Sequence, residues 1–583
     1  MPFAGGEHYY AYWSSGQYSP DIASLNTSLP IAVDLETKNL YSHEVIGTSL
    51  CIDPKKGSYF IPSLLSLSNH QRYIFHNANF DLRVLKRNGV SIPEDRIEDT
   101  WVQAHLIEEK DKRLSSLAHR YFGARFAEYK TSISGAEELS LSAWAAYSCP
   151  HSLYTYMLYE LFSREITRLG MEHLYRDIQL PLIPIIIDME DNGIAIDTSA
   201  ITTLKNSLMR ECELLNEAMV YWGGLGVNFS SGEQVGRLML KLGIPLTRLT
   251  QKKKLPSTRN EHLVSLRGTH PFINLLIRDR ACKKLLNTFI AEIESSIGED
   301  SRIHPHFNQT GTGPGRFSST NPNGQNIPVR SEEGKKVRRA FVAGPGMVLV
   351  VADYSQIELR CLAFCSNDQA MTRAYRENKD LHLETAIDVI GDPRRRFAGK
   401  TMNFSLVYGS GDEGLAKDAN VSVATIREWK EKYFQKYWGV ARYIERVRES
   451  AQRTGKVVTP NGRVRTIPGL TQGESKKDVE HALRQAVNTI IQGFAAEIVQ
   501  QGMIRMSRAI AGTRAKLLLQ VHDELVYECP PEEVKDLVRT MEEVLPHKDF
   551  DVPVEIGVGH SWGELTKYDR KGWAEVDEKK ALR

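Results

Sequence analysis

The sequence GMVLVVADYSQIELRCLAF, residues 346–364, places one carboxylate between an apolar run and a helical pattern. The unbroken apolar run from Met347 to Ala352 predicts a buried strand, and the apolar positions from Ile357 onward follow the period of a helix. Asp353 lies where the two elements meet. Functional groups are often found at the end of a buried strand, although an aspartate that caps the next helix is an equally good interpretation of this stretch alone.

A second stretch, LLLQVHDELVYE at residues 517–528, carries two adjacent carboxylates, Asp523 and Glu524, between two apolar runs. Short apolar runs on both sides of a polar turn predict a β-hairpin that packs into a core. Charged pairs beside a core are costly unless another group compensates them. We therefore expect Asp523 and Glu524 to face a compensating group.

A third stretch, DPRRRFAGKTMNFSLVYGSG at residues 392–411, predicts a helix with a mixed stripe of cations and aromatic rings. Arg396, Lys400, Phe404 and Tyr408 are spaced four apart, so they lie along one side of the helix. A salt-bridged surface helix is the simpler interpretation, but no acid occurs from 394 to 411. We therefore expect a polyanionic ligand such as a nucleoside triphosphate, with the cations on its phosphates and the rings against its sugar and base.

Two further segments favour contact with nucleic acid. Arg484, Asn488 and Gln492 lie four apart in the otherwise apolar helical segment at 480–499, and buried polar groups of this kind need hydrogen-bond partners. The loop at 308–331 is rich in small polar residues, and its Arg316 follows Gly315, which permits a close approach of the backbone. The backbone or base edges of nucleic acid would supply the partners.

The first third of the chain holds a separate set of acids. Asp34 and Glu36 lie two apart in the predicted strand LPIAVDLETKN, residues 29–39, so they share one face. Asp81 follows in a predicted strand–turn–helix segment, and Tyr147 and His151 share one face of a later aromatic-rich helix. Asp99 has the position of a helix N-cap, and we assign it that structural role instead.

The order of Asp34, Glu36, Asn77, Asp81 and Tyr147 resembles the three motifs of DEDD-type 3′–5′ exonucleases that have a tyrosine in the last motif. The resemblance implies two Mg²⁺ ions held by carboxylate oxygens. At the place of the family's fourth acid this sequence has His151. A neutral imidazole does not supply the missing charge and suits softer metals than Mg²⁺, so we expect excision to be severely reduced or absent.

Three segments in order, DYSQIELR, RRFAGKTMNFSLVYG and QVHDELVYE, resemble motifs A, B and C of the family A DNA polymerases. Further resemblance extends through TGTGPGRFSSTNPNGQNIP, TPNGRVRTIP and VPVEIGVGHSWGE, and it runs from about residue 30 to 570. The resemblance therefore covers nearly the whole chain.

The resemblance implies the roles of the residues around the reacting groups. Asp353 and Asp523 would hold two Mg²⁺ ions, for which Mn²⁺ is able to substitute, and Glu524 would support these ligands rather than bind metal throughout. Glu358 would block the 2′-hydroxyl of a ribonucleotide. The implied catalytic residues are Asp353, Asp523, Glu524 and Lys400, and those around the incoming dNTP are Arg396, Lys400, Phe404, Tyr408, Glu358 and His522.

The resemblance also implies a contact surface for primer–template DNA. The minor groove presents nearly the same acceptors for every base pair, so residues there test the shape of a pair without reading sequence. The residues implied in DNA contact are Arg316, Arg484, Asn488, Gln492 and Gln520.

The expected fold is a multidomain α/β protein, a ribonuclease-H-like exonuclease domain followed by a right-hand polymerase domain with palm, fingers and thumb. A length of 583 residues agrees with two to four domains. We expect an N-terminal extension at 1–29, the exonuclease-like domain at 30–175 and the polymerase domain at 176–583. Within the latter we place the thumb at about 200–292, the fingers at about 366–450 and the palm in the remainder.

The bulk composition limits the other function classes. With 41% hydrophobic and 25% charged residues the chain is typical of a soluble globular protein, and its net charge of +2 requires any polyanion-binding face to be local. Seven cysteines without a CxxC pair favour reduced thiols over a disulfide framework or zinc ribbon. No signal peptide or membrane-spanning run is visible, so we expect a cytoplasmic protein, in the host cytoplasm if a phage encodes it.

Other expectations come from the extent of the resemblance. No 5′-nuclease domain precedes the exonuclease-like part, and the thumb has no room for a thioredoxin-binding insertion, as in a compact phage-like member that acts as a monomer. Three alternatives stay open: a palm-type RNA polymerase or reverse transcriptase, a DNA-binding protein that has lost catalysis, and a polymerase that proofreads despite His151. Glu358 argues against the first, and the intact Asp353, Lys400 and Asp523 argue against the second.

Overall fold

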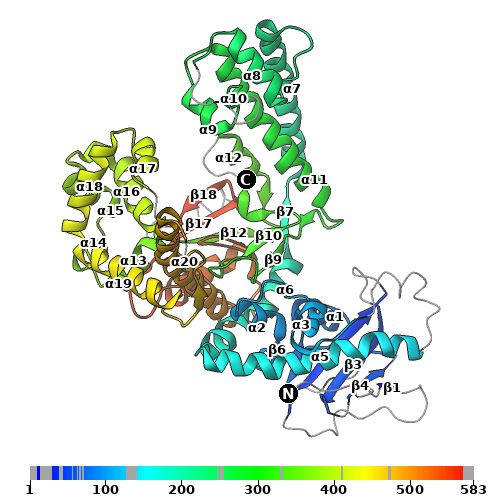
Figure 1. The fold of residues 1–583 in the computed structure, drawn as a ribbon. Coiled ribbons are helices and arrows are strands. Elements are labelled where there is room, and N and C mark those ends of the chain that lie inside the picture. The colour runs from blue at the N-terminus through cyan, green and yellow to red at the C-terminus, as the bar shows by residue number, and fades with distance from the viewer. Residues whose placement is uncertain are drawn as a thin grey trace.

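The computed structural model describes residues 10–12, 29–38, 44–55, 57–61, 63–64, 67, 71–126, 141–245, 249, 255–327, 332–408, 411–470 and 474–568. Over these residues the chain forms an N-terminal α/β unit, a central sheet flanked by long helices, and two helical groups that project from it (Figure 1). The prediction of a multidomain α/β protein is confirmed.

The N-terminal unit is built on a six-stranded sheet with the order β1-β4-β3-β2-β5-β6. Its strand β2 (Ile31–Thr37) pairs with the antiparallel β3 (Val45–Asp53) and the parallel β5 (Tyr73–Phe75), and its apolar side chains are buried. The long helix α5 (Leu141–Arg168) packs across β2, β3 and β4. The other elements of the unit are β1 (Tyr10–Tyr12), β4 (Gly57–Ile61), β6 (Ile97–Asp99), α1 (Ala78–Arg87), η2 (Glu94–Arg96), α2 (Thr100–Leu106) and α3 (Leu114–Phe122).

Local expectations for this unit agree with the structure. The strand predicted at 29–39 is β2, and the predicted helix start near Asp81 falls in the first turn of α1. Asp99 caps α2, since its carboxylate accepts hydrogen bonds from the backbone N–H groups of Trp101 and Val102. Within the segment 1–29, Tyr10–Tyr12 add the edge strand β1, parallel to β4.

The central sheet has eight strands, with the path β15-β16-β12-β17-β11-β7-β8 and β18 paired to β17. Strand β12 (Val348–Tyr354) lies between β16 (Glu524–Cys529) and β17 (Val554–Ser561), antiparallel to both, and every residue of it except Asp353 is buried. The predicted strand and the predicted hairpin, β15 (Lys516–Val521) with β16, are both confirmed. The remaining strands are β7 (Ile194–Ile196), β8 (Arg302–Ile303), β11 (Phe341–Val342) and β18 (Glu564–Lys567).

Long helices cover this sheet and connect it to the first helical group. Helix α13 (Ile357–Ser366) follows β12 directly and packs against α19 (Trp438–Thr454) and α20 (Lys476–Ala509). Helix α16 (Arg396–Tyr408) packs on α13, α15 and α20. The neighbouring elements are α14 (Gln369–Arg376), α15 (Leu381–Thr385), η7 (Ala386–Ile390), η8 (Pro393–Arg395), α17 (Asp412–Ala419), α18 (Val423–Lys436) and α21 (Val534–Val544).

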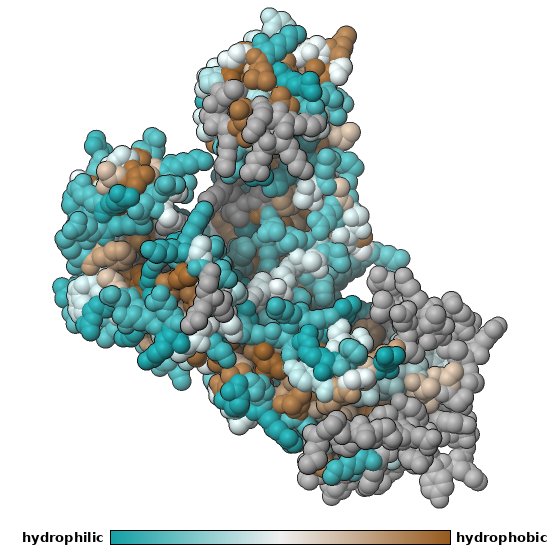
Figure 2. Space-filling view, viewed as in Figure 1, coloured by the Kyte–Doolittle hydropathy of each residue, from teal (hydrophilic) through white to brown (hydrophobic). Residues whose placement is uncertain are grey.

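The second helical group forms an arm with its own core. Helix α7 (Thr198–Gly223) and helix α10 (Pro271–Lys284) pack along each other, and α8 (Gly232–Lys241) and α9 (Asn260–Ser265) add apolar side chains to the same core (Figure 1). Figure 2 shows a hollow between this arm and the helical group around α14–α18, over the central sheet. The other elements are η4 (Leu174–Gln179), α6 (Leu182–Asn192), η5 (Leu285–Ile290), α11 (Ala291–Ser296), β9 (His306–Asn308), β10 (Ser318–Thr320), η6 (Gly324–Asn326), α12 (Glu332–Arg339), β13 (Lys456–Val458), β14 (Val464–Thr466) and η9 (Pro531–Glu533).

Polar contacts join the N-terminal unit to the rest of the chain. The buried carboxylate of Glu190 on α6 receives the Arg83 guanidinium from α1 and, at 2.6 Å, the backbone N–H of Phe307. The Glu108 carboxylate accepts from the backbone N–H of Thr466 at 2.9 Å and pairs with the Arg465 guanidinium. These ion pairs and the hydrogen bond between Glu108 and Thr466 each join a residue of the N-terminal unit to a residue of the rest of the chain, so they hold the two parts together.

Among the residues described, no helix combines the length and the apolar character that crossing a membrane requires.

Candidate active sites

The central sheet brings the carboxylates of the two predicted motifs together. Asp353 lies at the end of β12, and Asp523 lies in the turn between β15 and β16. The backbone N–H of Tyr354 donates to the carbonyl of Asp523 at 3.0 Å, which fixes the two segments side by side. Across the ladders Asp353 faces Glu524 on β16 and Glu555 on β17.

This arrangement concentrates negative charge. The side chain of Asp353 is exposed at the surface of the site, yet the surrounding protein shields it from much of the bulk water. That shielding, together with the carboxylates of Asp523 and Glu524, raises the pKa of Asp353 to about 7. Burial and then Glu358 also raise the pKa of Asp523. Acids in such surroundings favour a cation that neutralises them.

Glu524 differs from its neighbour because protein groups already hold it. Trp562 donates its indole N–H to one oxygen, and the Arg338 guanidinium lies 3.5 Å from the other. Arg338 also stacks 3.8 Å from the centre of the Trp562 ring and opposes the rise in the pKa of Asp353. Sequence reasoning missed Arg338, Trp562 and Glu555 as members of the site, although the segment VPVEIGVGHSWGE that holds the last two was singled out.

The predicted stripe of cations and aromatic residues lies on helix α16, and one of its cations already has an acidic partner. No acid occurs from 394 to 411, but Arg396 finds one outside this range, since its Nε lies 2.5 Å from the carboxylate of Asp380, the N-cap of α15. A lack of acids nearby in sequence does not exclude an acid from another element. Lys400 is exposed, pairs with no described acid, and lies 5.8 Å from the Phe404 ring. Tyr408 ends α16, and its side chain lies outside the described residues.

Around the paired carboxylates, some side chains that were predicted to bind DNA or dNTP form contacts with other protein groups in this structure. The Arg316 guanidinium pairs with Glu358, which is buried and whose second carboxylate oxygen has no hydrogen-bond partner in the described chain. Gln520 is buried and accepts from the Gln325 side chain at 3.0 Å. His522 is exposed at the surface with a positive φ of 59°, yet the surrounding protein shields its ring from part of the bulk water. That shielding, and then Arg316, lower the pKa of His522.

The predicted stripe on α20 is half-buried, and one of its polar atoms has no partner among the described residues. Arg484, Asn488 and Gln492 are half-buried beside the apolar core residues of that helix. The side-chain oxygen of Asn488 is buried and accepts no hydrogen bond from any described residue. An unsatisfied acceptor of this kind is costly unless a ligand or water reaches it.

A buried ion pair supports the loop that carries Arg316. The Arg463 guanidinium donates to the Glu497 carboxylate at 2.9 Å, and both side chains are at most 2% exposed. Gly315 has a φ of 92°, and a Cβ there would lie 2.7 Å from that guanidinium. The close approach that this glycine permits is therefore to Arg463. Gln500 holds the Gly315 carbonyl at 2.8 Å.

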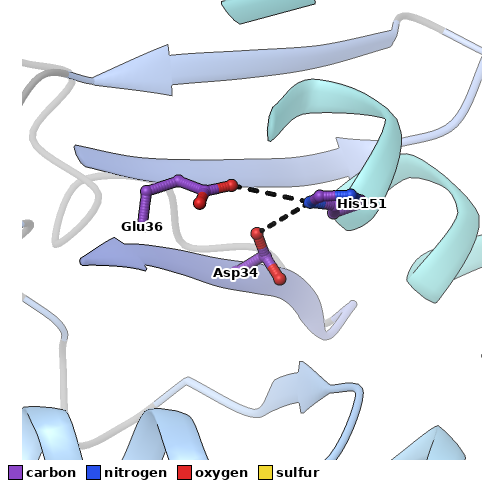
Figure 3. Close-up of side chains that lie close together, drawn as sticks. All are labelled: Asp34, Glu36 and His151. Atoms are coloured by element: carbon purple, nitrogen blue, oxygen red, sulfur yellow. Dashed lines mark ion pairs between the residues drawn. The ribbon is translucent and has the colours of Figure 1, made fainter. Parts of the chain in front are cut away.

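A second cluster lies in the N-terminal unit (Figure 3). Asp34 and Glu36 project from β2, and His151 projects from α5, which crosses that strand. The Nδ1 atom of His151 lies 3.4 Å from Asp34 Oδ2 and 3.5 Å from Glu36 Oε1. Asp81 is buried next to them and accepts from the backbone N–H of Leu35 at 3.1 Å. The predicted acids and His151 are thus brought together.

Aromatic rings hold His151 in this cluster. Tyr147 meets the imidazole edge-on at 5.0 Å between ring centres, and Phe126 stacks on it at 5.2 Å. Burial disfavours the charged imidazole, but the attraction of Asp34 and Glu36 overcomes it and raises the pKa of His151 to about 10. Burial also raises the pKa values of Glu36 and Asp81. Without metal, a protonated His151 balances part of the negative charge.

Fold and site together define a class: a right-hand nucleic-acid polymerase with paired carboxylates on its central sheet and a second, exonuclease-like carboxylate cluster. A model of DNA polymerase family A matches residues 198–564, and a 3′-5′ exonuclease model matches residues 20–167. The chain belongs to DNA polymerase family A. The predicted right-hand fold and exonuclease domain are confirmed.

Named relatives are bacterial polymerases. The chain is 35% identical to the thermostable DNA polymerase I of Thermus filiformis over 83% of this chain and 57% of the relative. It is 33% identical to DNA polymerase I of Synechocystis over 84% and 53%, so the chain spans just over half the length of these relatives. A solved structure, the POL domain of Pol1 from M. smegmatis in complex with DNA primer-template and dNTP, superposes with a TM-score of 0.82 at 29% identity, covering 92% of this chain and 95% of that one. The expected phage origin stays a prediction.

Proposed function

We propose that this chain performs template-directed DNA synthesis, adding dNTPs to the 3′ end of a primer. One observation carries the proposal: Asp353 and Asp523 lie side by side with an excess of negative charge, on a fold that belongs to the polymerase family. The solved Pol1 structure that this chain resembles holds primer-template DNA and dNTP, the same substrate classes.

The donor set fits Mg²⁺. Asp353 and Asp523 offer hard carboxylate oxygens, and their raised pKa values report charge that the protein leaves uncompensated. Mg²⁺ bound there, or Mn²⁺ in its place, would supply positive charge for the primer 3′-hydroxyl and the triphosphate. Glu524, held by Arg338 and Trp562, would position the turn that carries Asp523 rather than serve as a ligand.

Helix α16 would bind the incoming nucleotide. Lys400 is free to meet a phosphate, and Arg396 would exchange Asp380 for one, since both partners of that pair are exposed enough to separate. The Phe404 ring would lie against the sugar or base, with Tyr408 at the end of the helix. Glu358 would exclude a 2′-hydroxyl, and His522 would face the primer end.

The duplex would lie in the hollow between the two helical groups. Arg484, Asn488 and Gln492 would contact its minor groove from α20, where Asn488 has a free buried acceptor. Arg316 would reach the same groove after leaving Glu358, and Gln520 would support this surface. Correspondingly, we propose that 200–292 is the thumb, 366–450 the fingers, and that a single chain acts on DNA in the cytoplasm.

A primer-extension assay tests this function and distinguishes it from the alternative functions. Asp353→Ala and Asp523→Ala should each nearly abolish extension with dNTPs while leaving primer–template binding largely intact. Asp536→Ala, at an exposed acid on α21, serves as the matched control. Extension with rNTPs in preference to dNTPs would favour an RNA polymerase. Binding without any extension by the parent would favour a protein that has lost catalysis.

We further propose that 3′–5′ excision by the N-terminal unit is severely reduced or absent. The imidazole of His151 occupies the place of an anionic oxygen, and Mg²⁺ prefers oxygen ligands in near-octahedral geometry. The test is degradation of a mismatched primer without dNTPs, by the parent and by His151→Asp. Rapid excision by the parent would refute the proposal and favour a proofreading polymerase, whereas excision only by the variant would support it.

A further inference from the structure

The cluster of Asp34, Glu36 and His151 has one imidazole nitrogen and two carboxylate oxygens that lie within 4.8 Å of one another. We propose that it binds a single divalent transition metal of the Zn²⁺ class in tetrahedral geometry, instead of Mg²⁺. This inference rests on the proposal above that His151 impairs excision. The two share one premise, which is that Mg²⁺ binds poorly to the cluster of Asp34, Glu36 and His151.

The two distances from the imidazole to the carboxylates match tetrahedral coordination, and the carboxylate oxygens lie within 4.8 Å of each other. Zn²⁺ lies about 2.0–2.2 Å from imidazole nitrogen and carboxylate oxygen, so two ligands at a tetrahedral angle are about 3.4 Å apart. The distances from His151 Nδ1 to Asp34 and to Glu36 are 3.4 and 3.5 Å. Neighbouring ligands of octahedral Mg²⁺, at about 2.1 Å from the ion, would be only about 3.0 Å apart.

The same distances are long for hydrogen bonds between these groups. The Glu36 side chain is 11% exposed, and its buried Oε1 atom forms the 3.5 Å ion pair with His151 but accepts no shorter hydrogen bond within the part of the chain that is described (Figure 3). A buried oxygen left in this state is costly. A metal ion between the three side chains would satisfy it.

The chemistry of the donor set also favours a transition metal. Imidazole suits Zn²⁺ and its neighbours, whereas Mg²⁺ favours oxygen ligands and keeps several waters. Two carboxylates balance the charge of one divalent ion. Tyr147 and Phe126 fix the plane of the imidazole, so Nδ1 is directed at the carboxylates before metal arrives. On binding, the metal takes the place of the Nδ1 proton, which is released to solvent.

Three protein ligands leave a fourth position for water. A single ion, however, does not hold both the attacking and the leaving oxygen of a phosphodiester, as two ions do. The inferred site is therefore compatible with a domain that binds metal firmly and still excises poorly.

The test is titration of the metal-free full chain with Co²⁺, which reports tetrahedral coordination through intense visible absorption, followed by competition with Zn²⁺ and Mg²⁺. Asp353→Asn with Asp523→Asn removes the other carboxylate site from the measurement. In this background we expect one Co²⁺ equivalent that Zn²⁺ displaces and excess Mg²⁺ does not. His151→Ala should weaken this binding by about ten-fold or more and abolish the tetrahedral absorption.

Glu36→Gln, nearly isosteric, gives the second variant and should also weaken binding, while His119→Ala, at an exposed histidine of the same unit, should leave it unchanged. Identical titrations for the parent and His151→Ala, or displacement by equimolar Mg²⁺, would overturn the inference. The excision assay is read separately. Rapid Mg²⁺-dependent excision by the parent defeats the proposal of impaired excision, whereas slow excision without His151-dependent Co²⁺ binding defeats only this inference.

Discussion

Replacing His151 with aspartate should make the stability of the N-terminal unit depend on Mg²⁺ much more strongly than it does in the parent chain. In EDTA the parent gains stability because the His151 cation lies between Asp34 and Glu36, and its side chain is only 19% exposed. The variant places a third carboxylate there instead. Removing one partner from a buried charge cluster costs about 3–5 kcal/mol. The rise in the pKa of His151 from 6.5 to about 10 corresponds to a similar ceiling of about 5 kcal/mol.

The measurement is amide hydrogen exchange of β2 and α5, which reports the opening free energy of this unit alone. In EDTA at pH 7 the variant should open more easily by about 3–5 kcal/mol. Mg²⁺ at a hundred times its dissociation constant should return about 2.7 kcal/mol to the variant. The parent should respond to Mg²⁺ much less, and His119→Asp serves as the control for an added surface charge.

The dependence on pH has a defined sign. The pKa of His151 is higher in the folded chain than its ordinary value of 6.5, so the stabilisation is complete below pH 6.5 and is lost as pH rises through about 10. Protection of β2 and α5 in the parent, corrected for intrinsic exchange, should fall over this range. Equal protection of parent and variant in EDTA, or an equal gain from Mg²⁺, would refute the reasoning.

Three further outcomes are expected. Glu358→Ala should release Arg316 and raise the ratio of rNTP to dNTP incorporation by about ten-fold or more, measured as kcat/KM for each. Phe404→Tyr should improve incorporation of dideoxynucleotides, since its hydroxyl would replace the missing 3′-hydroxyl; unchanged use would mean that α16 is misassigned. Glu497→Ala leaves the buried Arg463 charge unpaired and should lower the free energy of unfolding in urea by about 3–5 kcal/mol, with a smaller loss for Glu497→Gln.

Local sequence patterns predicted the elements and the placement of most acids. The apolar run before Asp353 and the paired runs around Asp523 each predicted a strand end, and sheet pairing then brought the two together. Asp34 and Glu36 share a face because residues two apart on a strand always do. Asp99 was recognised as an N-cap because capping depends on neighbours only a few residues away.

Partners that are distant in sequence could not be predicted in the same way. The elements α15, η7 and η8 separate Asp380 from Arg396, and Glu358 reaches Arg316 from another element, so no local spacing reveals either contact. Trp562 meets Glu524 only because two strands share a sheet. The pairing of His151 with both acids needed α5 to cross β2, which its periodicity does not indicate.

The contacts that join the N-terminal unit to the rest of the chain bear on its persistence during evolution. Deleting that unit would strip Arg83 from the buried Glu190 carboxylate and Glu108 from the backbone N–H of Thr466. Glu190 would keep only His306 and the backbone N–H of Phe307 as partners, and an exposed strand end would remain on the rest of the chain. Selection for a stable body would thus preserve the unit even in a lineage that no longer uses it to remove nucleotides.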